Sequence, residues 1–218
     1  MKTSNIIILS TIGILISLNL WMAVDAKNKF ENYTKHNTAI HVDNKVTESS
    51  LGDFSHIIVS QSIHLNIETS TKNTISDSGK EQYQSTIIND TLYISGDAFI
   101  SIKCKSIKSI VLKGESKLNT EDLFSEYLLI KSFDDTRISL NNISLTKLDI
   151  YSTNDSRIIM TQSKIDTTNI LSTENSRIGI VGTLEVVRGE VKDNSNLSVT
   201  GANNTQFSKS GNASINMH

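Results

Sequence analysis

The sequence predicts an all-β fold, a β-helix or solenoid of roughly 20-residue coils preceded by strands of antiparallel type. A short phrase of the form Asp155-Ser156-Arg157-Ile158 recurs at a nearly constant interval along the second half of the chain. Apolar and polar residues alternate around each copy, as they do in half-buried strands. The chain also has no proline, which suits long strand ladders because proline removes a backbone donor.

The apolar residue that ends each copy of the phrase predicts an inward column of the solenoid. Its members are spaced by 20, 20, 20, 19 and 18 residues: Leu118, Ile138, Ile158, Ile178, Leu197 and Ile215. Alternate side chains of a strand share a face, so a second column is expected two residues later: Leu140, Met160, Ile180, Val199 and Met217. A third column precedes the anchors by about eight residues: Ile110, Ile130, Ile150, Ile170, Gly189 and Phe207. Leucine-rich repeats have a similar length, but their leucine signature is missing.

Residues 1–26 are expected to direct export. The segment 6–24 is uncharged and largely apolar, and Val24-Asp25-Ala26 fits the small-x-small pattern that precedes signal-peptide cleavage. The same run approaches the roughly 20 residues that span a bilayer, and Trp21 resembles an interfacial anchor. A cleaved signal peptide and a retained membrane anchor, which would give membrane association through residues 6–24, are therefore both open.

Residues 27–50 are polar without a persistent apolar period and predict a tether, followed by one domain over residues 51–218. Two apolar-rich runs, 54–59 and 63–67, flank Ser60-Gln61-Ser62 and predict a hairpin. A tight turn is expected at Asn89-Asp90. The further strands expected before the repeats are Tyr83–Ile88, Thr91–Ile94, Ala98–Ile102 and Ser109–Leu112.

Four cations occupy the same position in successive copies of the phrase and form the candidate binding stripe: Lys117, Arg137, Arg157 and Arg177. Strands in a ladder lie about 4.8 Å apart, so these like charges would repel unless they were compensated. The neighbouring Glu115, Asp135 and Asp155 could supply that compensation. The stripe then has two interpretations, a solvated charge ladder that keeps the solenoid soluble, or a surface that binds anions or acidic glycans.

The remaining polar positions indicate structure rather than chemistry. Five small hydroxyl residues precede the anchors and are expected to bond to corner backbone: Ser116, Thr136, Ser156, Ser176 and Ser195. The acidic corners recur too sparsely for a calcium β-roll, and the histidines lack metal-ligand spacing. The lone Cys104 cannot form an intramolecular disulfide. The sequence thus predicts no catalytic residue, cofactor or metal, although a polysaccharide lyase is the enzyme alternative for a long β-helix.

The order of strands and coils resembles the head GIN domain family over roughly residues 51–218. The resemblance is carried by Phe54-x-x-Ile57-x-Val59, by Ile63-x-Leu65-x-Ile67, by Thr91-Leu92-Tyr93-Ile94 and by the repeated polar corners. It implies an exported protein of the cell envelope (periplasm or cell surface) of a Gram-negative-type bacterium. The family bears an auto-transporter adhesin name that reflects inferred adhesion. Its corners usually contain glycine, whereas most corners here contain Asp, Asn or Glu; of these, Asn and Asp also tolerate left-handed backbone.

The expected function is therefore a non-enzymatic, adhesin-like binding module whose partner is a glycan or another envelope protein. A net charge of -2 predicts no nucleic-acid partner. The alternative is a membrane-tethered structural or envelope-sensing protein. Because Met217-His218 follow closely on the last anchor, we also expect an open final coil. Either that coil, residues 208–217, self-associates or pairs with a partner, or Phe207 and the amino-terminal strands shield it.

Overall fold

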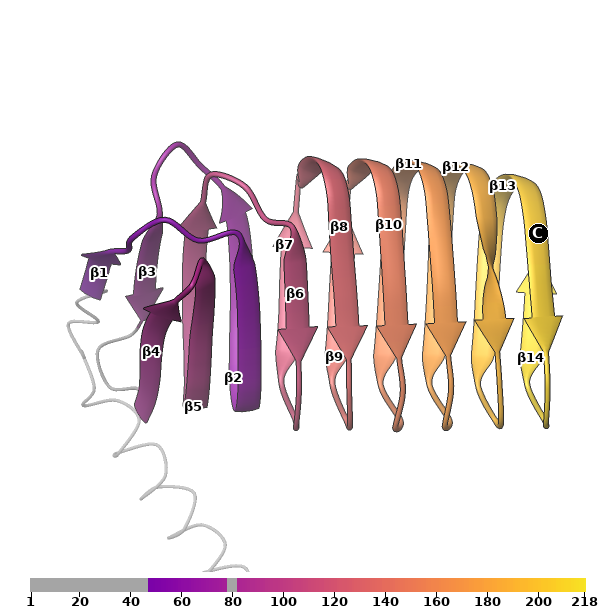
Figure 1. The fold of residues 1–218 in the computed structure, drawn as a ribbon, viewed down its shortest axis with the longest axis horizontal. Coiled ribbons are helices and arrows are strands. Elements are labelled where there is room, and N and C mark those ends of the chain that lie inside the picture. The colour runs from indigo at the N-terminus through magenta and orange to yellow at the C-terminus, as the bar shows by residue number, and fades with distance from the viewer. Residues whose placement is uncertain (1–46, 78–81) are drawn as a thin grey trace, which may run out of the picture. The chain divides into compact units, whose positions relative to one another are not determined.

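The computed structural model describes residues 47–77 and 82–218, where the regular structure consists of β-strands (Figure 1). In these ranges no helix is long and apolar enough to cross a bilayer. The predicted export segment lies outside the described residues. The strand bounds are β1 Thr47–Ser50, β2 His56–Thr69, β3 Thr74–Asp77, β4 Gln82–Ile88, β5 Thr91–Cys104, β6 Ser109–Leu112, β7 Lys117–Glu121, β8 Phe124–Ser132, β9 Arg137–Asn141, β10 Ser144–Ser152, β11 Arg157–Ser172, β12 Arg177–Val191, β13 Asn196–Lys209 and β14 Ser214–Met217.

The strands from β6 to β14 form stacked parallel coils, and the predicted solenoid is confirmed. Ile138, Ile158 and Ile178 are Cα partners on β9, β11 and β12, and all three are buried. The second inward column is in register as well, since Met160 pairs with Leu140 and Ile180. The third column continues from Ile170 to Gly189 and Phe207. The strict column of apolar side chains forms the dry interior that holds successive coils together.

Each coil has three sides, because the alternation of buried and exposed residues changes phase at three places. In the coil that starts at Arg157, the three sides carry successive groups of buried residues: Ile158 and Met160, then Ser163 and Ile165, then Thr168, Ile170 and Ser172. The third side is followed by a polar corner of four residues, which leads into the first side of the next coil. We call it the first corner. The next coil then begins at Arg177.

The first corners have left-handed backbone in every repeat. The second residue of each corner has a positive φ, between 54° and 72°: Gly114, Asp134, Asn154, Glu174, Asp193 and Gly211. Asn and Asp tolerate this conformation better than most residues, so they replace glycine here without changing the geometry of the corner. This explains how the chain keeps regular corners while departing from a glycine-based motif.

The hydroxyl column of the first corners is fully buried. Ser152 and Ser156 lie with their Oγ atoms 2.6 Å apart, and Ser172 and Ser176 repeat this contact at 2.7 Å one coil later. Ser176 Oγ also contacts the carbonyl of Ser152 at 3.0 Å. The prediction that these hydroxyls bond to corner backbone is confirmed at Ser116, whose Oγ donates to the carbonyl of Lys113 at 2.8 Å. The hydroxyl partner four residues earlier, seen at Ser156 and Ser176, is an additional feature. A buried polar group must find such partners to avoid a desolvation cost.

The predicted hairpin at residues 54–67 is wrong, because both runs belong to the single strand β2. Ser60-Gln61-Ser62 forms a first corner, with Gln61 at a φ of 72°. The residues before it pair in parallel with β6, and those after it pair with β7. A polar break between two alternating runs marks a hairpin turn or a solenoid corner equally well. Only the pairing partners distinguish the two.

The amino-terminal end of the solenoid departs from chain order. Parallel β5 lies on one side of β2, and β6 and β7 lie on the other, so β2 is inserted between segments that follow it in sequence. Strands β3 and β4 pair antiparallel with β5, and β1 pairs with β3. Asn89 and Asp90 both have positive φ, which confirms the tight turn between β4 and β5. Strand β1 occupies the last four residues of the predicted tether.

The carboxyl-terminal coil lies at the opposite end of the stack from β1, β3 and β4 (Figure 1). The prediction that the amino-terminal strands shield this coil is therefore wrong for the strands that the structure describes. Phe207 is half buried and packs against the core. Self-association through the final coil remains a prediction.

Candidate binding surfaces

The four predicted cations form one straight row on the outer surface. Lys117, Arg137, Arg157 and Arg177 are successive Cα partners on β7, β9, β11 and β12. Their side chains project outward because the next residue of each strand is an inward anchor. Neighbouring charges therefore recur once per strand, about every 4.8 Å along the solenoid. We call this row the cationic stripe.

The expected neutralisation of the stripe by acidic neighbours does not take the form of ion pairs. Considering only the residues that the structure describes, none of the four cations lies within 4.0 Å of a carboxylate oxygen, Glu115, Asp135 and Asp155 included. A groove of about 400 Å³ follows the stripe. Its lining consists of Lys117, Asn119, Arg137, Ile138, Ser139, Arg157 and Ile159. The stripe thus combines closely spaced like charges with a hollow in which an anion could lie.

The row of the stripe continues onto the amino-terminal coils with two rings that sequence reasoning missed. His64 pairs with Lys117 on one side and with Phe99 on the other. The two rings meet edge to face with centroids 4.4 Å apart, and Phe99 is 65% exposed. Burial, together with the charge of Lys117, lowers the pKa of His64 and favours the neutral imidazole. The stripe therefore ends in an uncharged aromatic patch.

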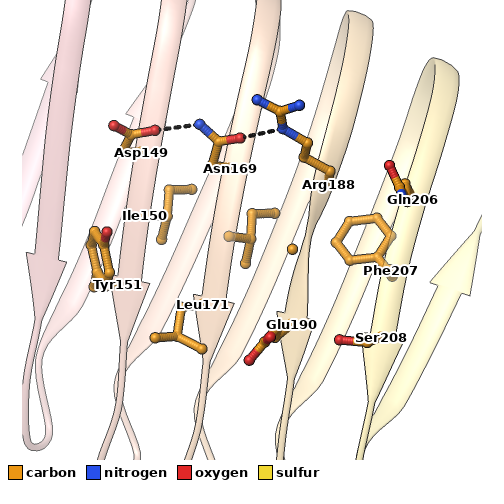
Figure 2. Close-up of a pocket in the computed structure, with 12 residues that line it drawn as sticks. Asp149, Ile150, Tyr151, Asn169, Leu171, Arg188, Glu190, Gln206, Phe207 and Ser208 are labelled. Atoms are coloured by element: carbon orange, nitrogen blue, oxygen red, sulfur yellow. Dashed lines mark hydrogen bonds between the residues drawn. The ribbon is translucent and has the colours of Figure 1, made fainter.

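A second groove lies on the neighbouring side of the coils, across β10 to β13 (Figure 2). It has a volume of about 580 Å³ and runs between two outward rows of side chains. One row consists of Asp149, Asn169, Arg188 and Gln206, and the other of Tyr151, Leu171, Glu190 and Ser208. Ile150, Ile170, Gly189 and Phe207 lie between the rows and form the floor. We call this the axial groove.

A hydrogen-bond network fixes the first row of the axial groove. Asn169 Nδ2 donates to Asp149 Oδ1 at 2.6 Å, and Arg188 Nε donates to Asn169 Oδ1 at 2.8 Å (Figure 2). Tyr127 OH donates to Asp149 Oδ2 at 3.0 Å, and Lys147 Nζ lies 3.3 Å from the same oxygen. Burial alone would raise the pKa of Asp149, but the donors from Asn169, Tyr127 and Lys147 outweigh it and lower that pKa. The carboxylate is therefore held charged and oriented.

Aromatic rings on this side of the solenoid are paired with lysines. The ammonium of Lys131 lies 5.5 Å from the centroid of the Tyr151 ring, and that of Lys147 lies 5.4 Å from the Tyr127 ring. Such cation–π contacts orient both partners, although they contribute only about 0.5–1 kcal/mol at exposed sites. Tyr151 is 44% exposed, so much of its surface is open to a ligand.

Neither groove has the features of a metal or thiol site. Over residues 47–77 and 82–218, no group of three His, Cys, Asp or Glu side chains could hold a metal ion. Cys104 is buried on β5, and burial raises the pKa of its thiol to about 11, which keeps it protonated at neutral pH.

The fold is shared with solved bacterial structures at low sequence identity. A "putative adhesin" from Bacteroides fragilis is 16% identical and has a TM-score of 0.63, over 79% of this chain and 96% of that chain. A "putative lipid binding protein" from Parabacteroides distasonis is 12% identical with a TM-score of 0.45, over 80% of this chain and 96% of that chain. The sequence matches no family model and no curated protein. The first likeness supports the solenoid fold alone.

Proposed function

We propose that this chain is an exported cell-envelope module of the head GIN type that binds acidic glycans through the cationic stripe, without catalysing a reaction. The observation that carries the proposal is the in-register row of four cations without ion-pair partners among the described residues. Like charges on adjacent strands are destabilising unless a counter-charge lies near them. A linear polyanion laid along the row would supply that charge on every coil.

The resemblance of residues 51–218 to the head GIN domain family and the apolar segment 6–24 support an envelope location. The shape of the surface supports binding rather than catalysis. The stripe cations point outward from a regular ladder, so they do not converge on one point as general acids and bases would. A glycan that runs parallel to the solenoid axis would instead contact equivalent positions on successive coils. This is how repeat proteins use an extended surface.

Retention on polyanionic matrices tests the proposal. The wild-type protein should be retained at low salt on immobilised dextran sulfate or polygalacturonate and should elute as salt rises. Replacing Arg137, Arg157 and Arg177 together by alanine should abolish retention. The matched control replaces Lys108, Lys164 and Lys209, which are equally charged and exposed but lie in separate rows. Absence of wild-type retention at low salt, or equal losses in both triple variants, would refute the proposal.

A further inference from the structure

We propose that the axial groove binds a neutral carbohydrate chain that lies along the solenoid axis. This site is distinct from the cationic stripe, because the two occupy different sides of the coil and are separated by the first corner, residues 153–156 in the coil of Tyr151. The inference therefore adds a second ligand class to the proposed function and does not depend on it.

The dimensions of the axial groove suit an extended chain rather than a compact small molecule. The groove crosses four adjacent strands, β10 to β13, whose spacing of about 4.8 Å gives a length of roughly 14 Å. Both of its walls are rows of side chains that run perpendicular to the strands. A ligand in the groove would consequently meet a new pair of side chains at each strand.

The polar wall is organised before a ligand arrives. Asn169 has its amide oriented by Asp149 on one side and by Arg188 on the other (Figure 2). Arg188 uses only its Nε–H in contacts with described residues, so its remaining guanidinium donors are available. Gln206 adds an exposed amide next to it. A row of fixed donors and acceptors suits a hydroxyl-rich ligand. The side chains are already ordered in the free protein, so binding does not lose the free energy of ordering them.

The opposite wall supplies apolar surface of the kind that sugars use. Tyr151 and Leu171 stand side by side in this row, and both side chains face outward. The C–H faces of a pyranose can pack on such rings and aliphatic groups, while its hydroxyls face the polar wall. Binding sites for small polar molecules commonly combine apolar lining with a few placed polar groups.

The charges of the groove favour a neutral ligand. Asp149 and Glu190 are carboxylates that would repel an anion, and among the described residues Arg188 is the one cation that lines the groove. Lys192 Nζ lies 2.5 Å from Glu190 Oε2 and so pairs with the second carboxylate. The Asp149 carboxylate is likewise satisfied by its donors. Neither excess charge nor a metal-binding cluster therefore selects an ionic ligand here.

Affinity electrophoresis of the full-length protein in gels that contain a neutral polysaccharide tests this inference. The probes are dextran, pullulan, mannan and galactomannan, each measured at low and high salt. We expect retardation by at least one probe, unaffected by salt. Tyr151→Ala and Asn169→Ala should each weaken binding about tenfold or more, as for central contact residues. The matched control is Tyr93→Ala, because Tyr93 is a similarly exposed tyrosine in the row of Tyr151 but lies on β5, outside the groove.

Failure of all four probes to retard the wild type would overturn the inference, as would equal effects of Tyr151→Ala and Tyr93→Ala. If Tyr151→Ala does not fold, the double variant Gln206→Ala and Ser208→Ala tests the same inference at the other end of the groove, where both residues are exposed. It should also weaken the retardation. The stripe variant that lacks Arg137, Arg157 and Arg177 should keep its retardation by the neutral probe. Loss of stripe binding and loss of groove binding are thus separately observable.

Discussion

Individual residues in this solenoid are constrained chiefly by whether they face the inside of a coil. Ile158 is fully buried between Ile138 and Ile178, whereas Ser139 on β9 points outward. Ile158→Asp would place an unpaired charge in a dry interior and should cost about 4–5 kcal/mol or more. Since domains have only about 5–15 kcal/mol of total stability, cooperative folding should be lost. Ser139→Asp should change the melting temperature little, and equal losses in a thermal melt would contradict the assigned alternation.

Asp149 should give the protein a measurable acid sensitivity. Its folded-state pKa is lowered below the ordinary value of 3.8, so the folded state favours the carboxylate. The stability from Asp149 is complete above that ordinary value and is lost as pH falls through the folded-state pKa. Asp149→Asn should lower stability at pH 7 by about 1–3 kcal/mol, because three donors lose a charged acceptor.

Urea unfolding at pH 7 and at pH 3 measures this effect. The difference in unfolding free energy between wild type and Asp149→Asn should shrink at the lower pH. An unchanged difference would show that the network around Asp149 does not stabilise its charged form. Asp166→Asn is a control, because Asp166 is an exposed carboxylate on β11 that lies outside the network.

At the scale of the elements, coil length is set at one corner. Successive coils shorten from 20 to 19 to 18 residues. Each shortening removes one residue from the corner between the first and second sides, just before Gly182 in one coil and just before Ala202 in the next. The shortened corners contain Gly182 and Gly201. A Cβ on Gly201 would lie 2.0 Å from the carbonyl oxygen of Gly182, and Gly201 has a φ of 85°. The tight corner therefore requires glycine.

Gly201→Ala should destabilise the protein by more than the roughly 1–2 kcal/mol of a left-handed residue, since a backbone clash is added. Gly179→Ala is the matched control, because a Cβ there meets nothing within 4 Å and the backbone is extended. The control should be neutral or stabilising by about 0.4–1 kcal/mol. Chemical denaturation of both variants checks this, and a tolerated Gly201→Ala would disprove the tight corner.

The coils could be predicted from the sequence because their register depends on local spacing alone. Ile138, Ile158 and Ile178 differ by one coil each, and the parallel pairing follows directly. The position of β2 between β5 and β6 could not be predicted, since it depends on pairing between segments far apart in the chain. The same limit concealed His64 and Phe99 at the end of the stripe.

The axial groove could not be predicted for a different reason. Its polar wall is spaced by 20, 19 and 18 residues, the interval of the anchors, so the positional signal was present. However, Asp149, Asn169, Arg188 and Gln206 are four different residue types, so no recurring residue marks this row in the sequence. The stripe can be recognised because the same kind of residue, a cation, recurs in each coil. The wall of the groove instead consists of different residues at equivalent positions, and Asp149, Asn169 and Arg188 among them are joined by hydrogen bonds.

The whole molecule presents adjacent surfaces of different character on one rigid ladder. The cationic stripe follows the first side of the coils, and the axial groove follows the third side. Because both run along the solenoid axis, an extended ligand on either would contact several coils and gain from each in turn. At the end of the stack, β14 pairs only with β13 among the described strands, so its outer edge is open to association.

The central claim is that the stripe cations act together on one extended anion. The most direct test is the affinity for dextran sulfate as a function of salt, measured by titration for wild type and for Arg137→Ala, Arg157→Ala and Arg177→Ala singly and combined. Each single change should lower the slope of log K against log salt by a similar amount, close to one, while melting changes little. In the combined variant, the slope should fall by the sum of the three single decreases. A slope that stays at the wild-type value in the triple variant would contradict the account.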